Sequence, residues 1–233
     1  MLLKSPLLFV LAFCTLLQVR GQKLFTSKIS YVAPVNPNNE SAFDLIQGSP
    51  LLLKTWVRGT VVNMDDSVIS DPDLRMNFDK LDGHLVVTRD NKNFLHTEKR
   101  DIKGFILYTD SGRLIFTKVP EINARDFFQL LAMGKTCTVY KRVNTTVKGS
   151  GYYHEGSAES AAHSARYVDY NSYYIMDVDG RNKFSTRFYA VKRSVRSAFS
   201  FDNDKMEQYF TQHRNVVIND AFIIGLSAYF NKR

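Results

Sequence analysis

Between residues 55 and 119 the chain repeats one pattern, and this pattern restricts its possible folds more than any other feature. Short runs rich in β-branched and aromatic residues alternate with turn-forming residues, such as Asp82-Gly83 and Asp110-Ser111-Gly112. Short strands with a turn every ~8–12 residues are typical of an antiparallel meander. The runs expected to form strands are residues 56–62, 74–78, 84–88, 93–98, 104–109 and 113–119.

The hydrophobic period changes after these runs. Asn123 can cap a helix and Gly134 can close it, while Phe127, Leu130 and Leu131 recur between them at helical spacing. The sequence therefore predicts one helix inserted after the strands. A long strand over 136–147 should follow.

The next segments predict a mobile loop and a hairpin. Residues 148–166 are rich in Gly, Ser and Ala, so we expect limited proteolysis to cut there first. Residues 167–178 and 183–189 are expected to form two strands around Asp179-Gly180, which is a favoured hairpin turn.

The C-terminal end is expected to be helical. Val191, Val195 and Phe199 recur every four residues, and Asp204 is expected to cap a second apolar helical pattern. Asn219 should cap a last helix, whose apolar stripe is Phe222, Ile223, Leu226, Tyr229 and Phe230. The predicted fold is α+β: an antiparallel meander or curved sheet, one inserted helix, and C-terminal helices packed on the sheet.

The first 21 residues have the features of a secretory signal peptide. Lys4 is followed by an apolar run over residues 7–17, and Val19 and Gly21 place small residues before Gln22. The run is shorter than the ~20 residues that span a bilayer, so we expect no transmembrane span in the mature chain. Residues 22–47 should form an extended lead-in, and residues 48–233 a single domain.

Cleavage after Gly21 would leave Cys137 as the one cysteine, which excludes an intramolecular disulfide. It would also remove Lys4 and Arg20, which lowers the net charge from +8 to +6. The remaining excess of basic residues favours anionic surfaces weakly.

Several strings together resemble those of a group of exported proteins of Bacteroidota that have a Gly-Ser-Pro opening, a β-rich body and no assigned activity. The opening is Gly48-Ser49-Pro50, and the similarity extends to about Lys141. The strings that carry it include Trp56-Val57-Arg58-Gly59-Thr60, Leu74-Arg75-Met76-Asn77-Phe78 and Phe127-Phe128-Gln129-Leu130-Leu131. The resemblance implies a secreted or envelope setting and identifies no functional residue.

No segment carries a complete metal-binding or cofactor-binding motif, and we expect the protein to hold neither a metal ion nor a cofactor. The run Asp177-Val178-Asp179-Gly180 starts like a calcium loop, but the glycine and the final acidic residue are misplaced, so a hairpin turn is favoured. His154-Glu155 lacks the second histidine of a zincin helix. Cys137, in a β-branched run, should be a small buried residue.

Basic residues alternate with aromatic residues between 183 and 196. On a strand followed by an amphipathic helix, the aromatic residues should face the core and the cations the solvent. We expect no nucleic-acid binding in an exported protein, but a weak contact with an anionic surface stays open. The residues for such a contact are Lys183, Arg187, Lys192, Arg193 and Arg196.

The absence of catalytic motifs favours a non-enzymatic exported protein of the cell envelope that binds a partner or ligand or has a structural role. One alternative is a secreted hydrolase with a dispersed site drawn from residues such as His96, Asp101, Glu121 and Asp126. Another alternative is attachment to a membrane surface through the basic residues between 183 and 196.

Overall fold

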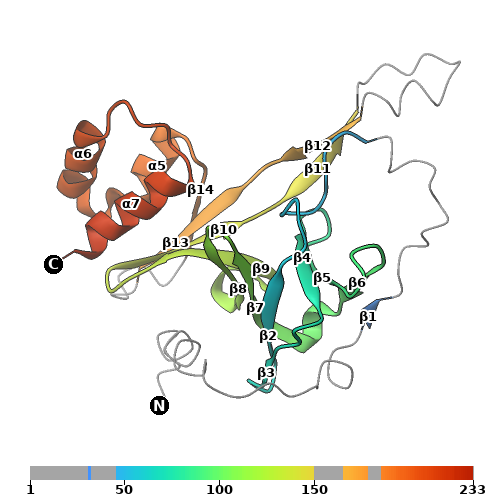
Figure 1. Cartoon of the computed structure of the whole chain (residues 1–233). Coiled ribbons are helices and arrows are strands. Elements are labelled where there is room, and N and C mark those ends of the chain that lie inside the picture. The colour runs from blue at the N-terminus through green and yellow to red at the C-terminus, as the bar shows by residue number, and fades with distance from the viewer. Residues whose placement is uncertain (1–30, 33–45, 150–164, 178–184, 233) are drawn as a thin grey trace, which may run out of the picture.

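The computed structural model describes residues 31–32, 46–149, 165–177 and 185–232 (Figure 1). The predicted signal peptide lies outside these residues, as do most of the predicted lead-in and most of the loop predicted over 148–166. Two residues of the lead-in, Tyr31–Val32, form the short strand β1.

An eight-stranded antiparallel sheet dominates the fold, in the order β14-β13-β10-β9-β8-β7-β2-β3. Strands β7 to β10 follow one another in sequence and in space, as in a meander, whereas the strands predicted over 74–98 form a separate four-stranded sheet. In sheet order the strands are Thr186–Phe188, Ser172–Asp177, Cys137–Arg142, Ala124–Met133, Gly112–Val119, Ile102–Thr109, Arg58–Asn63 and Val68–Ile69.

Two smaller sheets complete the strand content. A four-stranded sheet has the order β1-β6-β5-β4, where β4 is Arg75–Asp79, β5 is His84–Thr88 and β6 is Phe94–Thr97. The β4–β5 turn needs Gly83, whose φ of 69° lies in the left-handed region. The hairpin of β11 (Thr145–Lys148) and β12 (Arg166–Asp169) projects from the body (Figure 1).

The prediction of a helix between Asn123 and Gly134 is wrong. These residues form β9, and a single helical turn, α3 (Pro120–Asn123), precedes it. Strand β9 lies between β8 and β10, and Phe127 and Phe128 are both buried. Neighbouring residues of a strand point to opposite faces, so a strand covered on both faces is apolar at consecutive positions, which resembles helical spacing in the sequence.

One hydrophobic core lies between the four-stranded sheet and the β2–β7–β8 part of the large sheet. Phe78 of β4 packs against Phe105 and Phe116, with a distance of 4.9 Å between the ring centroids of Phe78 and Phe116. Phe105 and Phe116 stack at 4.8 Å. This cluster packs the two sheets against each other.

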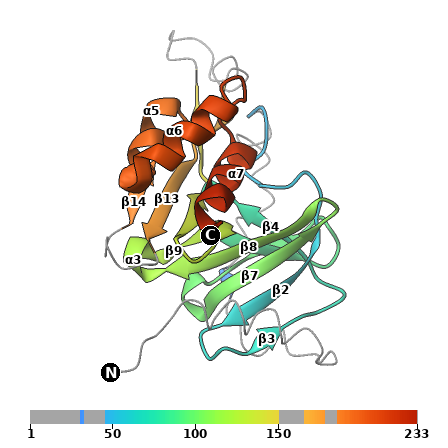
Figure 2. The same ribbon diagram turned by 90° about the vertical axis from the view of Figure 1, so that its left-hand side faces the viewer.

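The C-terminal helices cover the other end of the large sheet. Helices α5 (Lys192–Ala198), α6 (Asn203–Gln212) and α7 (Asp220–Asn231) lie together beside β13 and β14 (Figures 1 and 2). The 3-10 turns are Lys99–Asp101 and Ser200–Asp202. Phe199, Ile223 and Phe230 bury against Val139 and Phe188 of the sheet. This arrangement confirms the predicted α+β class and the packing of C-terminal helices on the sheet.

The helix boundaries differ in detail from the prediction. Asn219 caps α7 as expected, since its side-chain oxygen accepts a hydrogen bond from the Phe222 N–H at 3.0 Å. Helix α6 is capped by Asp202 and not by Asp204. Val191, predicted on an apolar helical stripe, precedes α5 and is 57% exposed.

Candidate functional site

The basic residues singled out in the sequence divide into two groups. Arg187 on β14 and Lys192 and Arg193 at the start of α5 are exposed, and within the described chain no carboxylate lies within ion-pair distance of them. Arg196 pairs with Glu207 at 2.7 Å, and its guanidinium lies over the Phe210 ring. Arg196 therefore links α5 to α6. Lys183 lies outside the described residues.

We call residues 187–193 the basic segment. Besides its three cations it exposes Tyr189, which is 48% accessible, and Val191. The Arg187 guanidinium lies 5.2 Å from the centroid of the Tyr189 ring, so the cation and the aromatic ring form one surface feature. The segment thus presents positive charge and apolar side chains side by side.

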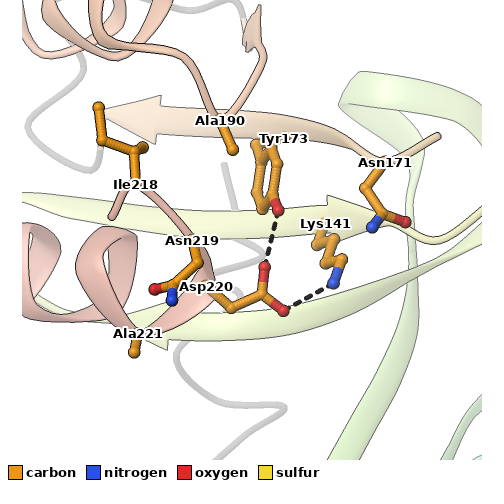
Figure 3. Close-up of a pocket in the computed structure, with 8 residues that line it drawn as sticks. All are labelled: Lys141, Asn171, Tyr173, Ala190, Ile218, Asn219, Asp220 and Ala221. Atoms are coloured by element: carbon orange, nitrogen blue, oxygen red, sulfur yellow. Dashed lines mark hydrogen bonds and ion pairs between the residues drawn. The ribbon is translucent and has the colours of Figure 1, made fainter. Parts of the chain in front are cut away.

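A pocket of about 450 Å³ opens next to the basic segment, between the sheet and the N-terminus of α7 (Figure 3). Ala190 of the basic segment forms part of its wall. The other lining residues are Lys141, Asn171, Tyr173, Ile218, Asn219, Asp220 and Ala221.

Three charged or polar side chains converge in this pocket. The Lys141 ammonium on β10 is 2.6 Å from Oδ2 of Asp220, and the Tyr173 hydroxyl on β13 donates a hydrogen bond to Oδ1 at 2.7 Å (Figure 3). Asp220 lies in the first turn of α7, where the helix dipole favours a negative charge. Burial raises the pKa of Tyr173, and the hydrogen bond and the charge of Asp220 raise it further.

This arrangement is suited to holding α7 on the sheet. One oxygen of Asp220 contacts the Lys141 ammonium and the other accepts a hydrogen bond from Tyr173, whose raised pKa keeps the proton on the tyrosine. A general base or an activated nucleophile needs a group with a pKa near the working pH, which the raised pKa of Tyr173 does not provide. The three side chains therefore hold the first turn of α7 against the strands.

None of the residues considered for a dispersed hydrolase site lines this pocket. Asp126 on β9 pairs with Arg142 at 2.8 Å. Asp101 lies in the 3-10 turn before β7, and Glu121 is exposed on α3. His96 on β6 faces a different pair of carboxylates, Asp79 and Asp82.

The surroundings of His96 have opposing effects on its pKa. Its Nε2 is 3.6 Å from Oδ2 of Asp79, and its ring stacks on His84 with 5.4 Å between centroids. Burial lowers the pKa of His96; the negative charges of Asp79 and Asp82 oppose the shift, and His84 adds to it. The net effect is a pKa below that of a free histidine.

The remaining sequence motifs give two structural results. Cys137 is fully buried on β10, as predicted for a small core residue. Asp177 ends β13, and residues 178–182 of the predicted hairpin turn lie outside the described residues, as do His154 and His163. Within the described ranges, no helix combines the length and apolar character needed to cross a bilayer.

Sequence reasoning missed both clusters of polar side chains. Lys141, Tyr173 and Asp220 are brought together by strand pairing and helix docking, and no local spacing connects them. The same holds for His96 and the carboxylates at the β4–β5 turn. No protein-family model, curated protein or solved structure matches this chain.

Proposed function

We propose that this chain is an exported, envelope-associated protein without catalytic activity, which binds an anionic lipid surface through the basic segment. The signal-like N-terminus and the resemblance to exported proteins of Bacteroidota support export. The observation that carries the binding proposal is the exposed run of Arg187, Tyr189, Val191, Lys192 and Arg193.

The charges of the segment favour an anionic partner. Each lysine or arginine near an anionic membrane contributes about 1 kcal/mol, and this attraction falls off within a Debye length of about 10 Å at 0.1 M salt. Three such cations therefore support weak, salt-sensitive attachment.

The apolar side chains favour lipid over a polysaccharide. Val191 beside the pocket is 57% exposed, and Val217, next to the pocket residue Ile218, is 74% exposed. An interfacial lipid layer can bury such groups together with an amphipathic tyrosine such as Tyr189. A hydrated, anionic sugar chain would use only the cations.

Binding to vesicles tests this function. The mature chain should sediment with vesicles that contain phosphatidylglycerol, and not with pure phosphatidylcholine, and salt should weaken the binding. Lys192→Gln combined with Arg193→Gln should reduce partitioning roughly 30-fold, since two contributions of about 1 kcal/mol each are lost.

A matched double variant separates the segment from the overall charge. Lys54→Gln with Lys92→Gln removes two exposed cations from the N-terminal half of the fold, and it should leave partitioning nearly unchanged. Equal losses in both double variants, or equal binding to both types of vesicle, would contradict the proposal.

A further inference from the structure

A second group of converging side chains lies at the turn between β4 and β5, and it is independent of the basic segment. We propose that Asp79, Asp82 and His96 form a binding site for Zn²⁺. Asp79 ends β4, Asp82 lies in the following turn, and His96 comes from β6, which pairs with β5. The pairing of β6 with β5 thus brings the histidine to the turn.

The distances suit three ligands of one metal ion. One ligand atom of each residue lies within 4.8 Å of the other two. The 3.6 Å between Nε2 of His96 and Oδ2 of Asp79 is too long for a hydrogen bond. It is close to the ~3.3 Å between two ligand atoms that bind a tetrahedral zinc at about 2.0–2.1 Å.

The buried carboxylate of Asp79 provides a further observation. Its side chain is 9% exposed, and the Leu81 N–H donates a hydrogen bond to Oδ1 at 2.8 Å, which fixes the orientation of the group. Among the described residues, Oδ2 accepts no hydrogen bond and points to His96. The carboxylate is therefore held with Oδ2 directed to the histidine, and a cation between the two groups would contact both.

The histidine is also held in place. Its ring stacks between His84, at 5.4 Å, and Phe94, at 5.8 Å. An ordered ring loses little conformational freedom when it binds a metal, so the site is partly preorganised. Imidazole and carboxylate together suit zinc, and three protein ligands leave a fourth position for water.

Lys99 opposes a cation at this site and offers a direct test. Its ammonium donates a hydrogen bond to the backbone oxygen of Asp82 at 2.5 Å, so a positive charge lies beside the turn. Lys80 is directed elsewhere, since it pairs with Asp169 at 2.7 Å. Removal of the Lys99 charge should therefore strengthen zinc binding. The inference revises the expectation, drawn from the sequence, that the chain holds no metal.

Calorimetric titration of the metal-free mature chain with ZnCl₂ tests the site. We expect one saturable zinc per chain. His96→Gln and Asp82→Asn should each weaken binding at least tenfold, and Lys99→Gln should strengthen it roughly threefold to tenfold by removing a like charge. His213→Gln, a histidine of α6's C-terminal end, is the matched control and should bind zinc like the original chain.

The result that overturns the proposal is the absence of saturable zinc binding, or an affinity that His96→Gln and Asp82→Asn leave unchanged. Circular dichroism should accompany each titration. If His96→Gln does not fold, Asp82→Asn decides alone, because Asp82 is exposed and its substitution leaves the core intact.

Discussion

The side chain of Asn231 connects the end of α7 to the sheet, and its replacement by alanine should destabilise the whole fold. Its Oδ1 accepts hydrogen bonds from the N–H groups of Thr136 at 2.8 Å and Cys137 at 3.1 Å. Its Nδ2 donates to the backbone oxygens of Cys137 at 3.1 Å and Ser227 at 2.9 Å. One side chain thus satisfies backbone groups on both the strand and the helix.

The expected loss of stability follows from the groups left without partners. Asn231→Ala leaves two partly buried N–H groups unsatisfied, at about 1–3 kcal/mol each, and water can replace some of these bonds. We expect a loss of about 3 kcal/mol from a total of roughly 5–15 kcal/mol. For a domain of this size, that corresponds to a decrease in Tm of roughly 6–12 °C.

Thermal unfolding followed by circular dichroism measures this decrease. Lys232→Ala, at the exposed position next to Asn231, is the control and should change Tm by less than about 2 °C. A Tm for Asn231→Ala equal to that of Lys232→Ala would refute the role of the side chain in holding α7 on the sheet.

Three further predictions concern pH, truncation and export. Burial raises the pKa of Tyr140 to about 12, above the ~10 of an unfolded tyrosine. The stability that Tyr140 contributes below pH 10 should therefore be lost as the pH rises towards 12. Tyr140→Phe should reduce this loss in denaturation curves measured between about pH 10 and pH 12. Truncation after Asn219 removes Phe222 and the rest of the buried stripe of α7, so the protein should be insoluble or lack near-UV dichroism, and an unchanged Tm would contradict this. The intact mass of exported protein should correspond to a chain that begins near Gln22, and a mass that includes residues 1–21 would disprove cleavage.

Much of the fold could be predicted because the signals were local. Period-two runs and turn pairs such as Asp82-Gly83 determine neighbouring strands in a meander, and Asn219 marks the start of α7 by its capping chemistry. Residues 123–134 were misassigned because a strand covered on both faces lacks alternation. Gly134 was misinterpreted for a different reason. It does not end a helix; a Cβ there would overlap the side chain of Asn231, which is 97 positions further along the chain.

The polar clusters could not be predicted because they depend on contacts between distant segments. Lys141 and Asp220 are 79 residues apart, and their ion pair exists only because α7 docks with its first turn over β10. Asp79 and His96 meet through the register of β5 with β4 and β6. The exposed cations at 187 and 192–193 were identified from the sequence, since their alternation with apolar residues is a local property. The ion pair of Arg196 with Glu207 was not predicted, because it depends on the packing of α5 against α6.

Fluorescence from a tryptophan within the basic segment tests the proposed function most directly. In a Trp56→Phe background, Val191→Trp places the one indole of the mature chain at the proposed contact surface, and Val68→Trp places it at an exposed site on β3. Addition of phosphatidylglycerol vesicles should shift the emission of the residue at 191 to shorter wavelength and leave that at 68 unchanged, because only the first should enter the lipid interface. No shift at 191, or the same shift at both positions, would contradict binding through this segment.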